Sequence, residues 1–112
     1  MRPIQITLMA GLALLMCACG PPKPSHAAMD IYLGEGRDWA AATPEHKTEA
    51  AHLLATAWGN THGWDAQRVD DAAAYLSTCL DGRFQDQSDS DAQTHSVIDA
   101  TTGCLIDHYE SN

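Results

Sequence analysis

The sequence predicts an all-α fold, a small three-helix bundle with one disulfide that follows a signal peptide and a proline-rich tether. Apolar residues recur three and four positions apart in three segments after residue 43, and no segment alternates as a strand would. Helices joined by short connections pack as a bundle. A chain of 112 residues has room for one small domain.

The N-terminus has the features of an export signal. One positive residue, Arg2, precedes a mostly apolar stretch over residues 4–16. That stretch is as long as the apolar core of a secretory signal, and too short for a membrane-spanning helix of about 20 residues. Met16-Cys17-Ala18-Cys19 follows and resembles the lipobox of bacterial lipoprotein signal peptides. The resemblance covers residues 1–20 and implies cleavage before Cys19, lipidation of its thiol and attachment to a membrane through that lipid.

The residue after the lipidated cysteine influences where such lipoproteins are sorted. Here it is Gly20 and not the aspartate that typically retains them in the inner membrane. The resemblance therefore implies an outer-membrane location facing the periplasm in a Gram-negative host. The alternative is an ordinary secretory signal cut near Ala28.

A proline-rich segment, residues 20–26, follows the cysteine and favours an extended spacer without internal hydrogen bonds. We therefore expect three parts: a lipoprotein signal peptide over residues 1–18, a lipidated and flexible tether over 19–29, and an acidic helical domain over 30–112.

The first helix of the bundle is predicted from Pro44 to Trp58. Thr43 suits the N-cap, proline suits the first position, and Gly59 is the expected stop. The second helix is expected to begin near Asp65 and to end at Gly82.

The third helix is expected to begin near Ser90 or Asp91, after a polar loop, and to present Val97, Ile98 and Cys104 on its apolar face. The segment from residue 30 to 42 gives a weaker pattern. Its apolar residues are expected to cover the open end of the bundle; they are Ile31, Leu33 and Trp39.

Two cysteines remain after the expected cleavage, Cys79 and Cys104, and both fall on predicted core faces. Export places them in an oxidising compartment, where an even count indicates a disulfide. The alternatives are a metal pair or a reactive thiol, but the pair lacks CxxC spacing and a nearby cationic cluster.

The strong negative charge of the chain indicates which kinds of molecule it can bind. Without Arg2, five Lys and Arg face fifteen Asp and Glu, a formal charge of −10. The phosphate backbone of a nucleic acid would be repelled by such a surface, so we expect that the protein does not bind nucleic acid. A basic envelope protein is the expected partner. The alternative is that the charge only keeps a small protein in solution.

No sequence motif predicts a cofactor, a metal site or a small-molecule substrate. The six histidines contain no H-x-x-x-H pair, and the aspartates at 86, 89 and 91 fail the calcium-loop pattern at Thr94 and Ala100. These aspartates are expected to form a solvated loop and a helix cap. No catalytic motif is present, and Ser77 has no base at a readable spacing. We therefore expect a protein that is not an enzyme.

Three tryptophans, Trp39, Trp58 and Trp64, lie near the ends of the first predicted helix. They are expected to fill the core of an alanine-rich bundle, or alternatively to anchor a partner. The leading hypothesis is a non-catalytic binding module of the inhibitor or immunity type. The alternatives are a structural lipoprotein of a secretion or conjugation machine, and a periplasmic acid-stress chaperone whose histidines sense pH.

Overall fold

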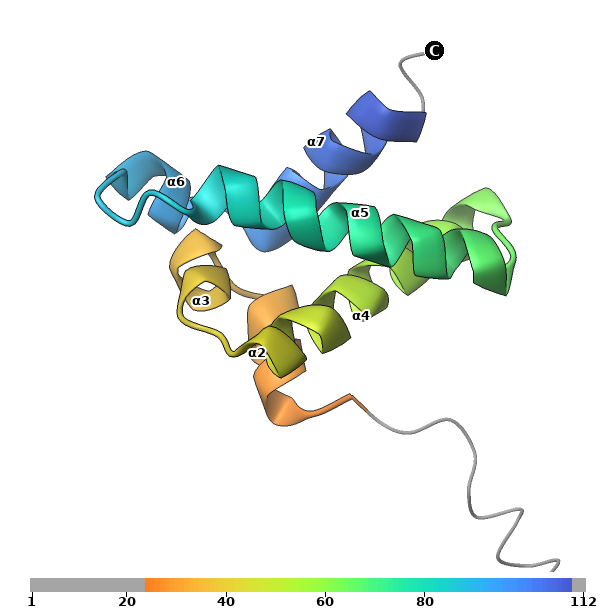
Figure 1. Ribbon diagram of the computed structural model, residues 1–112, viewed down its shortest axis with the longest axis horizontal. Helices are drawn as coiled ribbons and strands as arrows, with labels where there is room; N and C mark the ends of the chain where they lie inside the picture. The colour runs from red at the N-terminus through yellow and green to blue at the C-terminus, as the bar shows by residue number, and fades with distance from the viewer. Residues whose placement is uncertain (1–23, 110–112) are drawn as a thin grey trace, which may run out of the picture.

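The computed structural model describes residues 24–109, which form three long helices and three short ones (Figure 1). The helices are α2 (His26–Tyr32), α3 (Gly36–Ala40), α4 (Pro44–His62), α5 (Ala66–Phe84), α6 (Ser90–Thr94) and α7 (Val97–Tyr109). Between residues 24 and 109 the only β-type pairing is a single bridge, so the all-α prediction is confirmed. The expected signal peptide, Cys19 and the first part of the tether lie outside the described residues.

A hairpin of the two longest helices organises the domain. α4 and α5 pack against each other, α2 packs on α4, and α7 packs on α5 (Figure 1). α3 contacts both α5 and α6 at the opposite end of α5 from the α4–α5 turn. The three long helices are the predicted bundle, and the short helices close it.

α4 begins as predicted and ends later than predicted. The Thr43 side chain accepts a hydrogen bond from the His46 N–H, and Pro44 occupies the first turn. The helix continues through Gly59 to His62 and ends at Gly63, whose φ of 70° is in the left-handed region that glycine adopts without strain. The expected stop at Gly59 is therefore wrong.

α5 also begins as predicted and ends later. The Asp65 carboxylate accepts from the Arg68 N–H and caps the helix. Gly82 lies inside the last turn, and the helix ends at Phe84 because that buried side chain anchors the final turn in the core. The expected stop at Gly82 is wrong.

The expected third helix is two helices. Asp89 caps α6 by accepting from the N–H groups of Asp91 and Ala92, which confirms the predicted cap. The chain then turns extended at His95 and Ser96. There the Gly36 N–H donates to the His95 carbonyl, and the Val97 N–H donates to the Gly34 carbonyl. These contacts with a distant segment interrupt the helix.

The folded part begins earlier than the expected boundary at residue 30. Ser25 caps α2 by accepting from the Ala28 N–H, so residues 26–29 belong to a helix and not to a flexible tether. The Glu49 carboxylate of α4 accepts from the Ser25 N–H at 2.8 Å and from its hydroxyl at 3.0 Å. The α2 helix is thus held on α4 at its first residue.

The buried hydrophobic core draws its residues from α2, α3, α4, α5 and α7. Its largest fully buried side chains are Trp39, Phe84, Leu76, Leu80, Leu105, Val97 and Cys104. Ile31 and Trp39 cover the bundle as expected, but Leu33 is 70% exposed, so its expected place over the open end of the bundle is wrong. Leu33 follows the end of α2 as its C-cap, where the chain has already turned outward.

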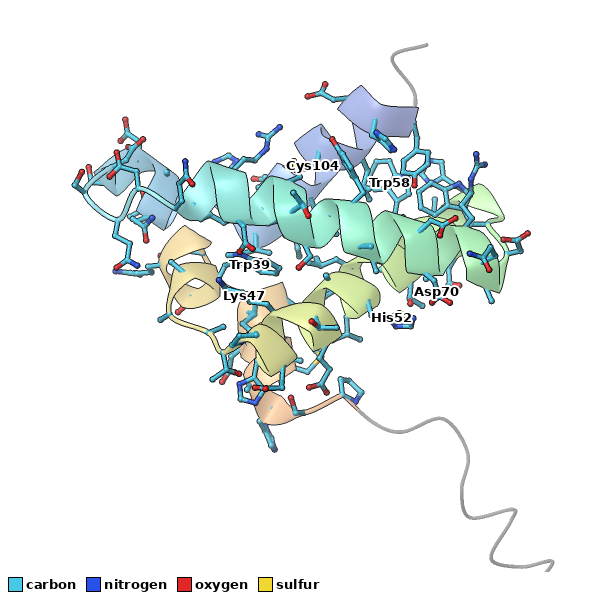
Figure 2. The ribbon with its side chains drawn as sticks, viewed as in Figure 1. Trp39, Lys47, His52, Trp58, Asp70 and Cys104 are labelled. Atoms are coloured by element: carbon cyan, nitrogen blue, oxygen red, sulfur yellow. A yellow bond between two sulfur atoms is a disulfide. The ribbon has the colours of Figure 1, made fainter. Side chains whose placement is uncertain are left out.

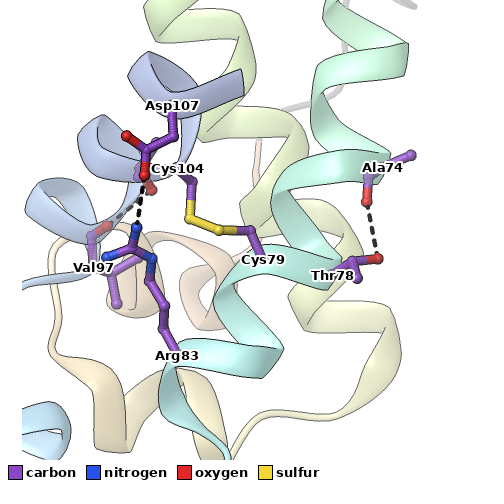
Figure 3. The surroundings of a disulfide bond; sticks show 8 residues. Ala74, Thr78, Cys79, Arg83, Val97, Cys104 and Asp107 are labelled. Atoms are coloured by element: carbon purple, nitrogen blue, oxygen red, sulfur yellow. Dashed lines mark hydrogen bonds and ion pairs between the residues drawn. A yellow bond between two sulfur atoms is a disulfide. The ribbon is translucent and has the colours of Figure 1, made fainter. Parts of the chain in front are cut away.

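The predicted disulfide is confirmed. Cys79 of α5 and Cys104 of α7 are bonded, with their Cα atoms 6.2 Å apart (Figure 3). Beside the bond, the Arg83 guanidinium lies 3.7 Å from the Asp107 carboxylate and joins the same two helices. α7 is therefore held on α5 by one covalent and one ionic contact.

Candidate functional site

A groove of about 250 Å³ opens between α4 and α7, and α2 contributes to its wall. Its lining is mostly apolar, with hydroxyls interspersed: Tyr32, Leu54, Ala57, Trp58, Thr61, His62, Ile98, Thr101 and Thr102. The sequence placed Trp58 and Ile98 on core-facing stripes. Trp58 is partly buried and packs against the core while lining the groove, whereas Ile98 is 41% exposed. Each wall is built from residues one helical turn apart, because side chains three or four positions apart share a face.

Aromatic and imidazole side chains form a continuous row of ring contacts beside the groove. The Trp58 indole and the His62 imidazole stack with centroids 4.6 Å apart and planes 7° from parallel. His62 Nδ1 also lies 2.9 Å from the Trp58 carbonyl oxygen. Both contacts arise because the residues are four positions apart on α4, so their side chains meet on one face.

The ring contacts continue to the C-terminal turn of α7. Trp64 contacts Tyr109 at 4.9 Å, and Tyr75 stacks on His108 at 3.9 Å. The Arg68 guanidinium carbon lies 5.7 Å from the Trp64 ring and 5.4 Å from the Tyr109 ring, within the range of cation–π attraction. Trp64 therefore packs the α4–α5 turn against α7.

The Trp58 indole N–H is buried and has no hydrogen-bond acceptor among the described residues. A buried donor without a partner costs about 1–3 kcal/mol. Trp58 is half-buried as a whole and lines the groove. An oxygen acceptor on a ligand that displaced the covering groups would remove this penalty.

Trp39 is not available as a partner anchor, although the sequence made it a candidate. Its side chain is fully buried, and its indole N–H donates to Asp81 at 2.9 Å. The Lys47 ammonium lies 3.1 Å from the same carboxylate oxygen and 5.8 Å from the Trp39 ring (Figure 2). Trp39 joins α3 to α5, and of the three tryptophans only Trp58 lies in the groove wall.

Every Lys and Arg side chain between residues 24 and 109 has a partner within the domain. Arg37 pairs with Glu35 at 2.8 Å, and Arg68 lies over its two aromatic rings. Lys47 and Arg83 form the ion pairs given above. Four Lys and Arg face fourteen Asp and Glu in this part of the chain. The surface therefore presents a large excess of negative charge.

A second depression, of about 370 Å³, lies between α4 and α5 and brings together three residues that the sequence did not connect: His52, Asp70 and Ser77. His52 Nε2 lies 3.4 Å from the Asp70 carboxylate (Figure 2), and Nδ1 lies 3.5 Å from the Thr56 hydroxyl. Both ring nitrogens thus face residues other than Ser77, so this is not the geometry in which histidine activates a serine nucleophile.

The aspartates of the polar loop serve the fold. The Ser88 hydroxyl donates to Asp86 at 2.6 Å and the Ser88 N–H at 3.0 Å, and these bonds lower the pKa of Asp86. The buried Gln93 amide donates to the carbonyls of Phe84 and Asp86 and fixes the loop on the end of α5. Within residues 24–109, no group of three or more His, Cys, Asp or Glu side chains is arranged to hold a metal ion.

Among the described helices, none has both the length and the apolar character needed to cross a bilayer. Comparison of the chain with protein-family models, with curated proteins and with solved structures finds no match. Among the described residues, the groove and the acidic surface are the features that bear on function.

Proposed function

We propose that this chain is a non-catalytic lipoprotein of the bacterial envelope whose acidic helical domain binds another, basic envelope protein. It is tethered through a lipid on Cys19, at the outer membrane and facing the periplasm. The partner is a cationic toxin or hydrolase that the domain inhibits, as an immunity protein does.

The charge of the domain carries this proposal. Fourteen acidic residues face four basic ones, and all four basic side chains are engaged inside the domain. An approaching protein therefore meets carboxylates with few competing cations. The negative surface attracts positively charged proteins and so raises the rate at which they associate with the domain. It repels acidic proteins, and a basic partner is therefore favoured.

The tether supports the same proposal. A proline-rich segment holds a domain away from its attachment point by about 3.1 Å per residue, and Ser25, where the folded part begins, is bound to Glu49. A lipid at Cys19 would keep the domain within a short distance of the membrane. That placement suits the capture of an incoming envelope-active protein.

In-cell crosslinking followed by affinity purification tests the proposal. The full-length chain is expected to recover one basic partner in a fixed ratio, and the purified pair should bind more weakly as salt is raised, because screening shortens the range of charge attraction. A Cys19→Ser variant should leave the membrane fraction. Recovery of no partner, or of an acidic one, would refute the proposal. A large set of subunits from one envelope machine would favour the structural alternative.

A further inference from the structure

Of the three exposed large hydrophobic side chains among the described residues, one lines the α4–α7 groove and the other two lie on or directly after the helices that form it. The three are Leu33, Ile98 and Ile106, with exposed fractions of 70%, 41% and 39%. Ile98 lines the groove, and Leu33 directly follows the groove residue Tyr32. Ile106 lies eight positions beyond Ile98 on α7, about 12 Å along the helix and about 80° around its axis.

The groove is small. Its volume of about 250 Å³ lies near the lower end of the roughly 300–1,000 Å³ of pockets that enclose small molecules. Such a volume suits one or two anchor side chains of a protein partner, which supply most of the binding energy of many interfaces. The exposed Leu33 and Ile106 extend the apolar surface beyond the groove itself.

The net charge indicates whether the groove binds a second copy of this chain or a different protein. Each copy carries fourteen acidic and four basic residues over residues 24–109, so two copies repel each other. The exposed Asp99 follows Ile98 and lies one turn from Thr102, at the margin of the groove. A basic segment of a partner protein is therefore attracted to the groove, and an acidic segment is repelled.

We propose that the α4–α7 groove is the docking surface for an amphipathic basic helix of the partner protein. Its apolar residues enter beside Trp58 and Ile98, and its lysines and arginines are attracted by the exposed Asp99 and by the net negative charge of the domain. Two helices present a furrow into which the side-chain ridge of a third helix packs. This inference rests on the proposed function and adds the face and the kind of segment that is bound.

Site-specific photo-crosslinking in cells tests the docking surface. A photoreactive residue replaces Ile98 in the full-length chain, and the matched control replaces Ala74, an exposed residue of α5 in the other depression. The expected result is an adduct at position 98 and none at 74, with the crosslinked peptide containing apolar residues flanked by Lys or Arg.

The other outcomes separate the two proposals. Adducts at 74 and not at 98 would overturn the groove while leaving a protein-binding function in place. An adduct between two copies of this chain, or to lipid, would also overturn the groove. If neither position reacts although affinity purification recovers a basic partner, the groove is wrong; if no partner is recovered either, both proposals fail.

A purified system gives an independent test. The probe is a synthetic amphipathic peptide of leucine and lysine, with a scrambled peptide of equal charge as control. The Ile98→Glu variant is expected to weaken binding at least 10-fold, although it adds negative charge, and Ala74→Glu should change binding less than 2-fold. Equal affinity of Ile98→Glu and wild type, or of the two peptides, would show that only diffuse charge attraction is present and would overturn the groove.

Discussion

The indole N–H of Trp39 donates to the carboxylate of Asp81 at 2.9 Å, and this bond ties α3 to the last turns of α5. Lys47 of α4 reaches the same oxygen at 3.1 Å, so three helices meet at one carboxylate. The bond lets a fully buried tryptophan close the core with its polar atom satisfied.

Removing this acceptor should destabilise the domain. Asp81→Ala is expected to lower the free energy of unfolding by about 1–2 kcal/mol, because the buried indole N–H loses its partner. Asp81→Asn keeps an oxygen acceptor and loses only an exposed ion pair, which is worth about 0.2–1 kcal/mol. Thermal unfolding of both variants measures the difference. Equal losses would show that the Trp39 bond contributes nothing beyond the ion pair with Lys47.

Two helical glycines should respond in opposite directions to alanine. A Cβ at Gly59 would lie 2.9 Å from Cγ2 of Val69, so the Val69 side chain or α5 itself would have to shift. Overpacking of this kind costs about 1–3 kcal/mol. A Cβ at Gly82 meets nothing within 4 Å, and alanine is favoured over glycine inside a helix by about 0.5–1 kcal/mol.

Urea unfolding provides the measurement. Gly59→Ala should lower the midpoint, Gly82→Ala should raise it, and neither should change the slope, since the surface exposed on unfolding is the same. Val69→Ala removes the contacting methyl groups, so Gly59→Ala made in that background should cost much less. If the cost is the same in both backgrounds, the contact with Val69 is not its cause.

Local signals in the sequence predicted where the two longest helices begin. Thr43 caps α4 as expected, and Asp65, near which the second helix was expected to begin, caps α5, because capping depends only on neighbouring backbone N–H groups. The disulfide was also predictable, from two cysteines on apolar faces and an export signal.

The sequence-based predictions were wrong where tertiary contacts determine the end of a helix or the exposure of a side chain. Gly59 was expected to end a helix, but it is a point of close approach to α5, which no local pattern reveals. The break between α6 and α7 is set by hydrogen bonds from residues 34–36, some sixty positions away. The groove was missed because Ile98 lies on an apolar stripe, and its exposure depends on how α7 sits against α4.

The disulfide should contribute much of the stability. Cys79 and Cys104 are separated by 25 positions, and closing a loop of that length is worth about 3 kcal/mol in the chain-entropy account. Reduction should therefore shift urea unfolding of the wild type to lower concentration. A variant with Cys79→Ser and Cys104→Ala should unfold early with or without reductant. If reductant leaves wild-type unfolding unchanged, the bond is not needed to hold α7.

The bond between Ser25 and Glu49 should make the start of α2 sensitive to acid. The Ser25 N–H and then its hydroxyl are the main causes that lower the pKa of Glu49 from its usual value near 4.5. A carboxyl with a lowered pKa in the folded state stabilises the fold above its unfolded pKa. That contribution is lost as the pH falls below about 4.5 and through the lowered value.

Hydrogen–deuterium exchange of the α2 amides measures this effect locally. In the wild type, protection over residues 26–33 should be complete near neutral pH and should fall in acid. Glu49→Gln removes the charged acceptor, so its α2 amides should exchange faster at neutral pH and change little on acidification. Glu45→Gln alters an exposed glutamate one turn earlier on α4 and should leave α2 protection as in the wild type. Loss of α2 protection in acid that is the same in Glu49→Gln as in the wild type would assign the sensitivity to another group.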